Sequence, residues 1–170
     1  MFGAPGVGKS FVLRKIKEVL LESNQKCEAI APTHAAARLI DGTTVHYFLG
    51  KYSKYAFEGW VLLDEISMLT LPLIAALSQM VSRMKIICFG DFDQLNPCFN
   101  SWRGKPIEEN VFEHSQLLKT WSENTNCKLT KCRRSDKQQF GVYCGLSNNL
   151  EEATHAVVSR LKRKRMETCM

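Results

Sequence analysis

The stretch that most constrains the fold stands at the start of the chain, where residues 3–10 read GAPGVGKS. This matches the phosphate-binding loop pattern G-x-x-x-x-G-K-[ST]. Its glycines let the backbone turn tightly and bring N–H groups against phosphate oxygens, and the helix that follows directs its positive end at them. The pattern predicts ATP and Mg²⁺ as ligands, with a Gly-rich turn as the alternative. The nucleotide-binding residues would be Gly3, Ala4, Pro5, Gly6, Val7, Gly8, Lys9 and Ser10.

Length and charge narrow the class of protein. A chain of 170 residues is one domain by length, and its net charge of +6 suits a polyanionic partner. Part of the excess is a basic tail, which fits a solvated end as well as a nuclear localisation signal or a nucleic-acid contact. The tail cations are Arg160, Lys162, Arg163, Lys164 and Arg165.

Cysteine usage indicates the compartment. The seven cysteines are an odd number without a C-x-x-C pair, and the sequence shows no secretory leader. We therefore expect an intracellular, reducing location, with a nucleus or a viral replication site among the possibilities. No apolar run reaches the length that spans a membrane, so we expect no membrane partner.

Short apolar runs alternate with helical patterns along the chain. This alternation predicts an α/β domain with a mostly parallel sheet. We expect residues 43–49 to form a short helix or turn, closed off from the preceding helix by Asp41-Gly42, and residues 50–59 to form a loop or small hairpin. Expected strands cover 27–31, 60–63, 85–90 and 127–130; expected helices cover 11–23, 34–40, 71–84, 111–121, 136–146 and 150–161.

Polar residues follow the apolar strands at the places where ligands of parallel sheets bind, beyond the carboxyl ends. Thr33, Asp64 and Asp91 each stand at such an end, as does Lys9 after the loop. This shared location predicts one site.

The residue types at this edge suit phosphoryl transfer, which needs charge neutralisation and a positioned water. Lys9 supplies a cation, Asp64 can hold Mg²⁺ opposite Ser10, and Glu65 can orient or deprotonate the attacking water. The Asp-Glu pair could instead cap a helix. Gln94 is a candidate γ-phosphate sensor, because an amide both donates and accepts hydrogen bonds.

Six ordered blocks extend this interpretation: GAPGVGKS, APTHAAARLI, GTTVHYFL, VLLDEISML, GDFDQLNP and KLTKCRRSD. In this order the chain resembles the RecD-type, superfamily 1B DNA helicases over most of residues 3–136. The resemblance implies a three-layer, RecA-like P-loop NTPase domain over residues 1–150, followed by a C-terminal helix and basic tail over residues 151–170.

The resemblance also implies roles for single residues. Gln94 would couple nucleotide state to DNA, and Arg134 would reach the γ-phosphate. Single-stranded DNA would run past four residues, two of which are histidines. Without the flanking blocks, these histidines would be interpreted as ordinary hydrogen-bonded residues near the surface. These four are Thr33, His34, Thr44 and His46.

Some features depart from the family. Only Met1 and Phe2 precede the loop, so the central first strand is incomplete, and a second RecA-like domain is not found downstream. Residues 50–59 are short for a strand-separating pin, and we expect Tyr52, Tyr55 and Phe57 to pack rather than stack on bases. The chain would then be a fragment, a split gene product or an incomplete gene model, or would meet a second motor domain on another chain.

The sequence thus predicts an ATP-dependent helicase motor domain that acts on single-stranded DNA. Alone, the chain is expected to hydrolyse ATP weakly and to unwind little or no duplex. Two alternatives remain open: a viral-type superfamily 1 RNA helicase domain, and a remnant that binds partners without catalysis.

Overall fold

The computed structural model describes residues 1–55, 57–92, 100–107, 116–121 and 125–131. They belong to two units. The first comprises Met1–Gly3 and Lys9–Leu129 and contains the sheet, whereas the described part of the second is the loop Ala4–Gly8 and residues 130–131.

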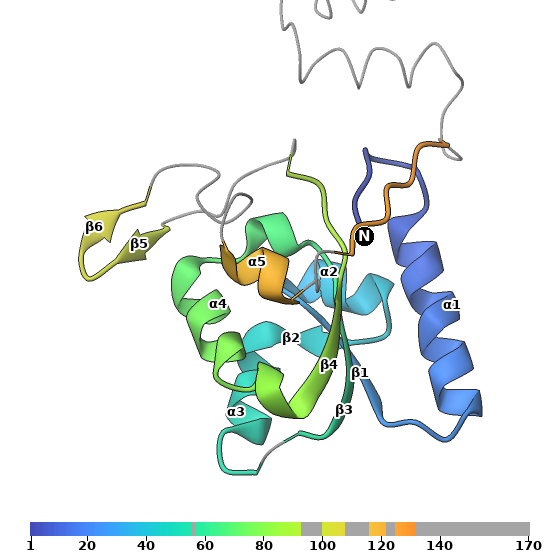
Figure 1. Ribbon diagram of the computed structural model, residues 1–170, viewed down its shortest axis with the longest axis horizontal. Helices are drawn as coiled ribbons and strands as arrows, with labels where there is room; N and C mark the ends of the chain where they lie inside the picture. The colour runs from blue at the N-terminus through green and yellow to red at the C-terminus, as the bar shows by residue number, and fades with distance from the viewer. Residues whose placement is uncertain (56, 93–99, 108–115, 122–124, 132–170) are drawn as a thin grey trace, which may run out of the picture. The chain divides into compact units, whose positions relative to one another are not determined.

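The first unit is built on four parallel strands in the order β2-β1-β3-β4 (Figure 1). The register sets Cys27 opposite Trp60 and Gly59 opposite Met84, so three strands begin at one edge and end at the other. The parallel α/β sheet predicted from the alternating pattern is confirmed. The strands are β1 (Cys27–Ala31), β2 (Thr43–Thr44), β3 (Gly59–Leu63) and β4 (Met84–Cys88), with a separate antiparallel pair β5 (Ser101–Trp102) and β6 (Lys105–Pro106).

Helices cover both faces of this sheet, α1 on one side and α3 with α4 on the other (Figure 1). Among the described residues, no helix combines the length and apolarity required to cross a membrane. The helices are α1 (Lys9–Glu22), α2 (His34–Leu39), α3 (Val45–Tyr52), α4 (Leu71–Ser78) and α5 (Gln116–Trp121), with 3₁₀ turns η1 (Ile66–Met68) and η2 (Val81–Arg83).

The three layers follow from the period of two in the buried strands. In β3, Val61 and Leu63 join the core under α3 and α4, whereas Leu62 joins the core under α1 and α2. In β1, Ile30 joins the core under α3 and α4, whereas Ala29 joins the core under α1 and α2. Strands buried on both faces are expected to be continuously apolar, and the buried ends of these two strands are apolar, whereas the half-buried start of β1 contains Glu28.

The first residues of the chain complete the sheet beyond β4. Phe2 forms parallel bridges to Gly90 on one side and Lys128 on the other. The Phe2 N–H donates to the Cys127 carbonyl at 2.8 Å, and the Leu129 N–H donates to the Phe2 carbonyl at 2.8 Å. The strand expected over 127–130 is therefore reduced to one bridge, and Phe2 alone represents the incomplete first strand.

The expected helix over 71–84 is too long. α4 ends at Ser78, and the chain turns where the Met80 N–H donates to the Leu77 carbonyl at 2.9 Å. Met84 already pairs with Gly59 in the sheet, and a paired residue cannot remain helical. The helices expected over 136–146 and 150–161, the basic tail and the domain boundary at 150 lie outside the described residues.

The segment around residues 43–59 also differs from expectation. Residues 43–44 form β2 and α3 runs on to Tyr52, so residues 50–55 and 57–58 contain no hairpin strand. The rings of Phe48, Tyr52 and Phe57 pack together with centroids 4.9–5.5 Å apart, which confirms packing for Tyr52 and Phe57. Tyr55 is instead 76% exposed.

The turn after α2 uses its two residues differently from the expected glycine closure. Asp41 takes the left-handed conformation, with φ of 48°. Gly42 is needed for a close approach, because a Cβ there would lie 2.3 Å from the Ala29 carbonyl oxygen.

Two glycine substitutions are expected to have opposite effects. A Cβ on Gly90 would lie 2.6 Å from Cγ2 of the fully buried Ile66, a branched atom that cannot swing away. We expect Gly90→Ala to lower the free energy of unfolding by about 1–3 kcal/mol through overpacking. In α3, Gly50→Ala should raise it by about 0.5–1 kcal/mol, because alanine is the better helix former.

Urea denaturation followed by circular dichroism measures both free energies. Equal stability of the Gly90→Ala and Gly50→Ala proteins would contradict the close packing of β4 against η1.

Candidate functional site

The phosphate-binding loop has the backbone that its glycines permit. Gly6 and Gly8 have φ of 80° and 94°, in the region that side chains rarely enter. The chain enters α1 directly afterwards, at Lys9. A loop followed at once by a helix N-terminus is the arrangement that binds phosphate.

The first turn of α1 directs two polar side chains to the ends of neighbouring segments. The buried Lys9 Nζ donates to the Gly3 carbonyl oxygen at 2.5 Å. Ser10 Oγ donates to Asp64 Oδ2 at 3.1 Å, although the two residues are far apart in the chain. The structure therefore brings together the start of α1 and the end of β3, as the sequence predicted.

Asp64 follows β3 and is only 3% exposed. Its second oxygen, Oδ1, accepts from the Glu65 N–H at 3.0 Å. Burial raises the pKa of Asp64, while the hydrogen bonds from Ser10 and Glu65 and the charge of Lys9 act in the opposite direction. The carboxylate is thus held in place by partners that favour its charged form.

Glu65 is held in a left-handed conformation, with φ of 53° and ψ of 45°. Such a backbone costs about 1–3 kcal/mol in a residue other than glycine and is concentrated at functional sites. Its side chain forms no capping hydrogen bond to η1, so the alternative of a helix cap fails for Glu65. Burial, and then the charges of Asp64 and Asp91, raise the pKa of Glu65, against the effect of Lys9.

Asp91 supplies a third carboxylate, which is buried at 5% exposed and follows β4. The ends of β3 and β4 are joined where the Phe89 N–H donates to the Leu63 carbonyl at 2.7 Å and the Ile66 N–H donates to the Phe89 carbonyl at 3.0 Å. The sequence placed Asp91 at a strand end but gave it no role. The Gly-Asp pair after the strand was the available signal.

Comparison with protein families adds an independent observation. The model of the AAA domain, AAA_19, matches residues 1–100, which is more than half of the chain. The chain belongs to this family. A comparison with curated proteins gave no match.

Several solved structures of Pif1 helicases are similar to this chain. Two coordinating Pif1 helicases studied for unwinding of forked duplex DNA give a TM-score of 0.64 at 21% identity, over 86% of this chain and 43% of that one. Pif1 from Candida albicans gives 0.61 at 20%, over 86% and 39%. Bacteroides Pif1 bound to single-stranded DNA gives 0.56 at 18%, over 86% and 42%.

These likenesses establish the fold, which is the RecA-like helicase fold expected from the sequence. The chain spans about two fifths of the length of these solved structures. A narrower membership of the RecD type stays a prediction.

Two predicted DNA-contact residues of the AAA domain cap helices. Thr33 Oγ1 accepts from the Ala36 N–H at 3.2 Å at the start of α2, and Thr44 Oγ1 accepts from the Tyr47 N–H at 3.2 Å at the start of α3. Both helices begin at the same edge of the sheet, because Thr44 pairs with Ala31. Thr33 is exposed, whereas Thr44 is 8% exposed and offers little surface to a ligand.

His34 and His46 lie in the first turns of α2 and α3, and both are exposed. Their contact with DNA stays a prediction. Gln94 and Arg134, the predicted γ-phosphate residues, lie outside the described residues.

The oxygens of Ser10 and Asp64 fit a magnesium ion bound together with nucleotide. Mg²⁺ prefers hard oxygen ligands and usually takes one or two from protein, with the rest from phosphate and water. Within the described residues, no three His, Cys, Asp or Glu side chains gather to hold a metal ion by themselves. A magnesium ion held by these two oxygens would take its remaining ligands from phosphate and water.

The hydrogen bond that caps α2 allows the structural role of Thr33 to be tested apart from its predicted contact with DNA. We expect Thr33→Ala to lower the free energy of unfolding by about 1 kcal/mol, because the Ala36 N–H loses its acceptor. Thr33→Ser keeps the hydroxyl and should stay close to wild type, as should His34→Ala, whose side chain is exposed. Thermal unfolding measures all three, and a neutral Thr33→Ala would contradict the cap.

Proposed function

We propose that this AAA domain is the ATP-hydrolysing motor domain of a superfamily 1B helicase that acts on single-stranded DNA. The observation that carries the proposal is the meeting of Lys9, Ser10, Asp64 and Glu65 where α1 begins and β3 ends. Support for DNA comes from the Pif1 structures, one of them bound to single-stranded DNA and another to ADP-AlF3 and single-stranded DNA.

In this proposal each side chain acts on a stated atom. The Lys9 ammonium faces the β- and γ-phosphate oxygens and neutralises their charge. Ser10 and, through water, Asp64 would hold magnesium, which would supply further charge neutralisation. The Glu65 carboxylate orients the attacking water and accepts its proton.

The raised pKa of Glu65 suits that role. A base whose pKa lies nearer the operating pH accepts a proton more readily than an ordinary exposed carboxylate. Asp91 contributes by its negative charge, which acts on Glu65 without touching the nucleotide.

Other parts of the proposal rest on the family resemblance. Gln94 senses the γ-phosphate, Arg134 reaches it, and His34 and His46 line the DNA track. Unwinding needs two motor domains that open and close as ATP binds and is hydrolysed, so the active helicase includes a second RecA-like domain. We place this helicase inside the cell.

A second candidate is a binding remnant without turnover. The observation that favours it is the thin extension of the sheet beyond β4, where Phe2 forms one bridge to Gly90 and one to Lys128. A sheet weakened there could hold nucleotide without the rigidity that catalysis requires.

Two substitutions separate these candidates. Lys9→Ala removes the cation that neutralises the phosphates, so we expect loss of ATP binding as measured with a fluorescent ATP analogue. Glu65→Gln removes the base but not the phosphate contacts, so we expect near-normal binding and hydrolysis slowed by about 10²–10⁴-fold, measured as phosphate release. Lys15→Ala is the control, because Lys15 is exposed and forms an ion pair with Glu18 on the surface of α1.

Absent phosphate release from the wild-type chain, with or without nucleic acid, would favour the remnant. Stimulation of release by single-stranded RNA but not DNA would favour an RNA helicase. Robust duplex unwinding by the chain alone would contradict the need for a second motor domain.

A further inference from the structure

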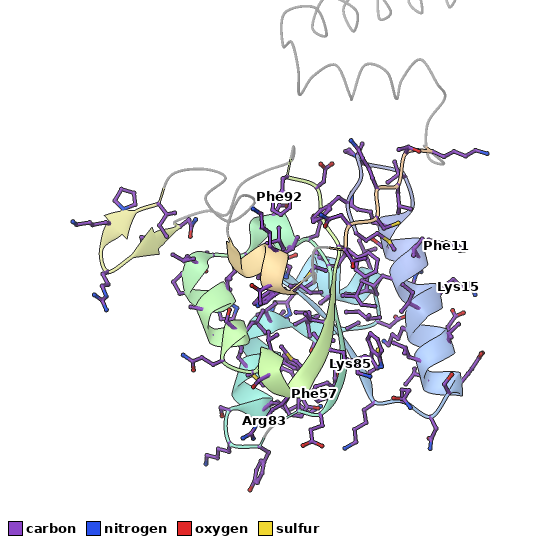
Figure 2. All side chains as sticks on the ribbon, in the orientation of Figure 1. Phe11, Lys15, Phe57, Arg83, Lys85 and Phe92 are labelled. Carbon is purple, nitrogen blue, oxygen red and sulfur yellow. The ribbon has the colours of Figure 1, made fainter. Side chains whose placement is uncertain are left out.

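A pocket of about 460 Å³ opens at the amino ends of the strands, on the edge of the sheet opposite the candidate site. Figure 2 shows Arg83 and Lys85 at this end of β4 and Phe92 beyond the other end. A five-residue strand spans about 16 Å, so the two edges are separate surfaces. The pocket is lined by the segments before β1, β3 and β4, namely Asn24–Lys26, Glu58–Trp60 and Ser82–Lys85.

Paired backbone forms the base of this amino-edge pocket. The Trp60 N–H donates to the Lys26 carbonyl at 2.8 Å, and Gly59 pairs with Met84. Gly59 also approaches Lys26 so closely that a Cβ on it would lie 2.6 Å from that carbonyl oxygen. The side chains around the pocket therefore project from fixed strand ends.

The amino-edge pocket is positively charged. Lys26, Arg83 and Lys85 line it and are exposed, against the single carboxylate of Glu58. Among the described residues, neither Lys26 nor Arg83 forms an ion pair, and Lys85 lies over the ring of Trp60 with its Nζ 5.1 Å from the centroid. Three cations gathered without carboxylate partners are available to an anionic ligand.

We propose that the amino-edge pocket binds single-stranded nucleic acid, with its cations on a phosphodiester. The guanidinium of Arg83 presents parallel N–H groups that match phosphate oxygens. Asn24 and Gln25 carry amides that donate to and accept from base edges, and Trp60 offers aromatic surface. An acidic peptide would use the cations but would leave the amides and the ring without a matching partner.

This surface goes beyond the proposed motor activity. It uses no residue of the phosphate-binding loop and none of Thr33, His34, Thr44 and His46. Binding here would give the domain a second contact surface for nucleic acid, and its affinity would not depend on bound nucleotide.

The test measures affinity of the full chain for fluorescein-labelled dT12 by fluorescence anisotropy at several salt concentrations. We expect Arg83→Gln with Lys85→Gln to weaken binding by about 3–10-fold. The slope of log affinity against log salt concentration should become less negative by about 1.4, because two phosphate contacts that each contribute about 0.7 are lost. Intrinsic fluorescence should fall on binding, and this quenching should be reduced in Trp60→Phe.

The matched control is Arg14→Gln with Lys54→Gln, which removes the same charge from exposed cations outside the pocket. Equal weakening by the control, or unchanged affinity of the pocket variant, would overturn the inference. Competition by poly-glutamate as strong as by dT12 would assign the pocket to an acidic peptide instead.

The motor proposal and the pocket proposal can fail separately, because they are tested by different substitutions. Lys9→Ala should abolish ATP binding and leave the effect of the pocket variant on dT12 unchanged. Loss of dT12 binding only on replacement of His34 and His46 would overturn the pocket and support the DNA track. Absence of any dT12 binding would overturn both nucleic-acid assignments, while ATP hydrolysis would still test the motor.

Discussion

The hydrogen bond from Ser10 to Asp64 joins the two halves of the candidate site, and the other residues there depend on it. It connects the first turn of α1 to the end of β3 at 3.1 Å. Asp64 in turn accepts a hydrogen bond from the N–H of Glu65. This bond offsets part of the free-energy cost of the left-handed backbone at Glu65. A helix start, a strand end and a strained turn are thus fixed by one carboxylate.

Much of the fold could be predicted because the central strands are buried on both faces. Such strands read as mostly apolar runs, and Cys27–Ala31, with Glu28 as its one charged residue, and Gly59–Leu63 lie where the pattern places them. The end of α4 could not be predicted in this way. An apolar pattern continues through Met80 and Met84, and only the pairing of Met84 with Gly59 decides that the chain is extended there.

The gathering of polar residues at one edge of the sheet was predictable, but their geometry was not. Parallel strands bring their carboxyl ends together, which is why Asp64 and Asp91 could be grouped from the sequence. The left-handed conformation of Glu65 stands next to Ile66, which packs against Gly90 from a distant part of the chain, and no local residue pattern encodes it. Thr33 shows the converse case, since its observed contact is a cap on α2 and its proposed ligand role is not visible in its contacts.

The two edges of the sheet differ in charge in a way that bears on what each can bind. The carboxyl edge holds buried carboxylates, Asp64 and Asp91, whereas the amino edge presents exposed cations such as Arg83. Charges about 16 Å apart across the sheet lie beyond the screening length of about 8 Å at physiological salt. Cations at the amino edge therefore contribute little to neutralising a nucleotide at the carboxyl edge. If they serve binding, they serve a different anion.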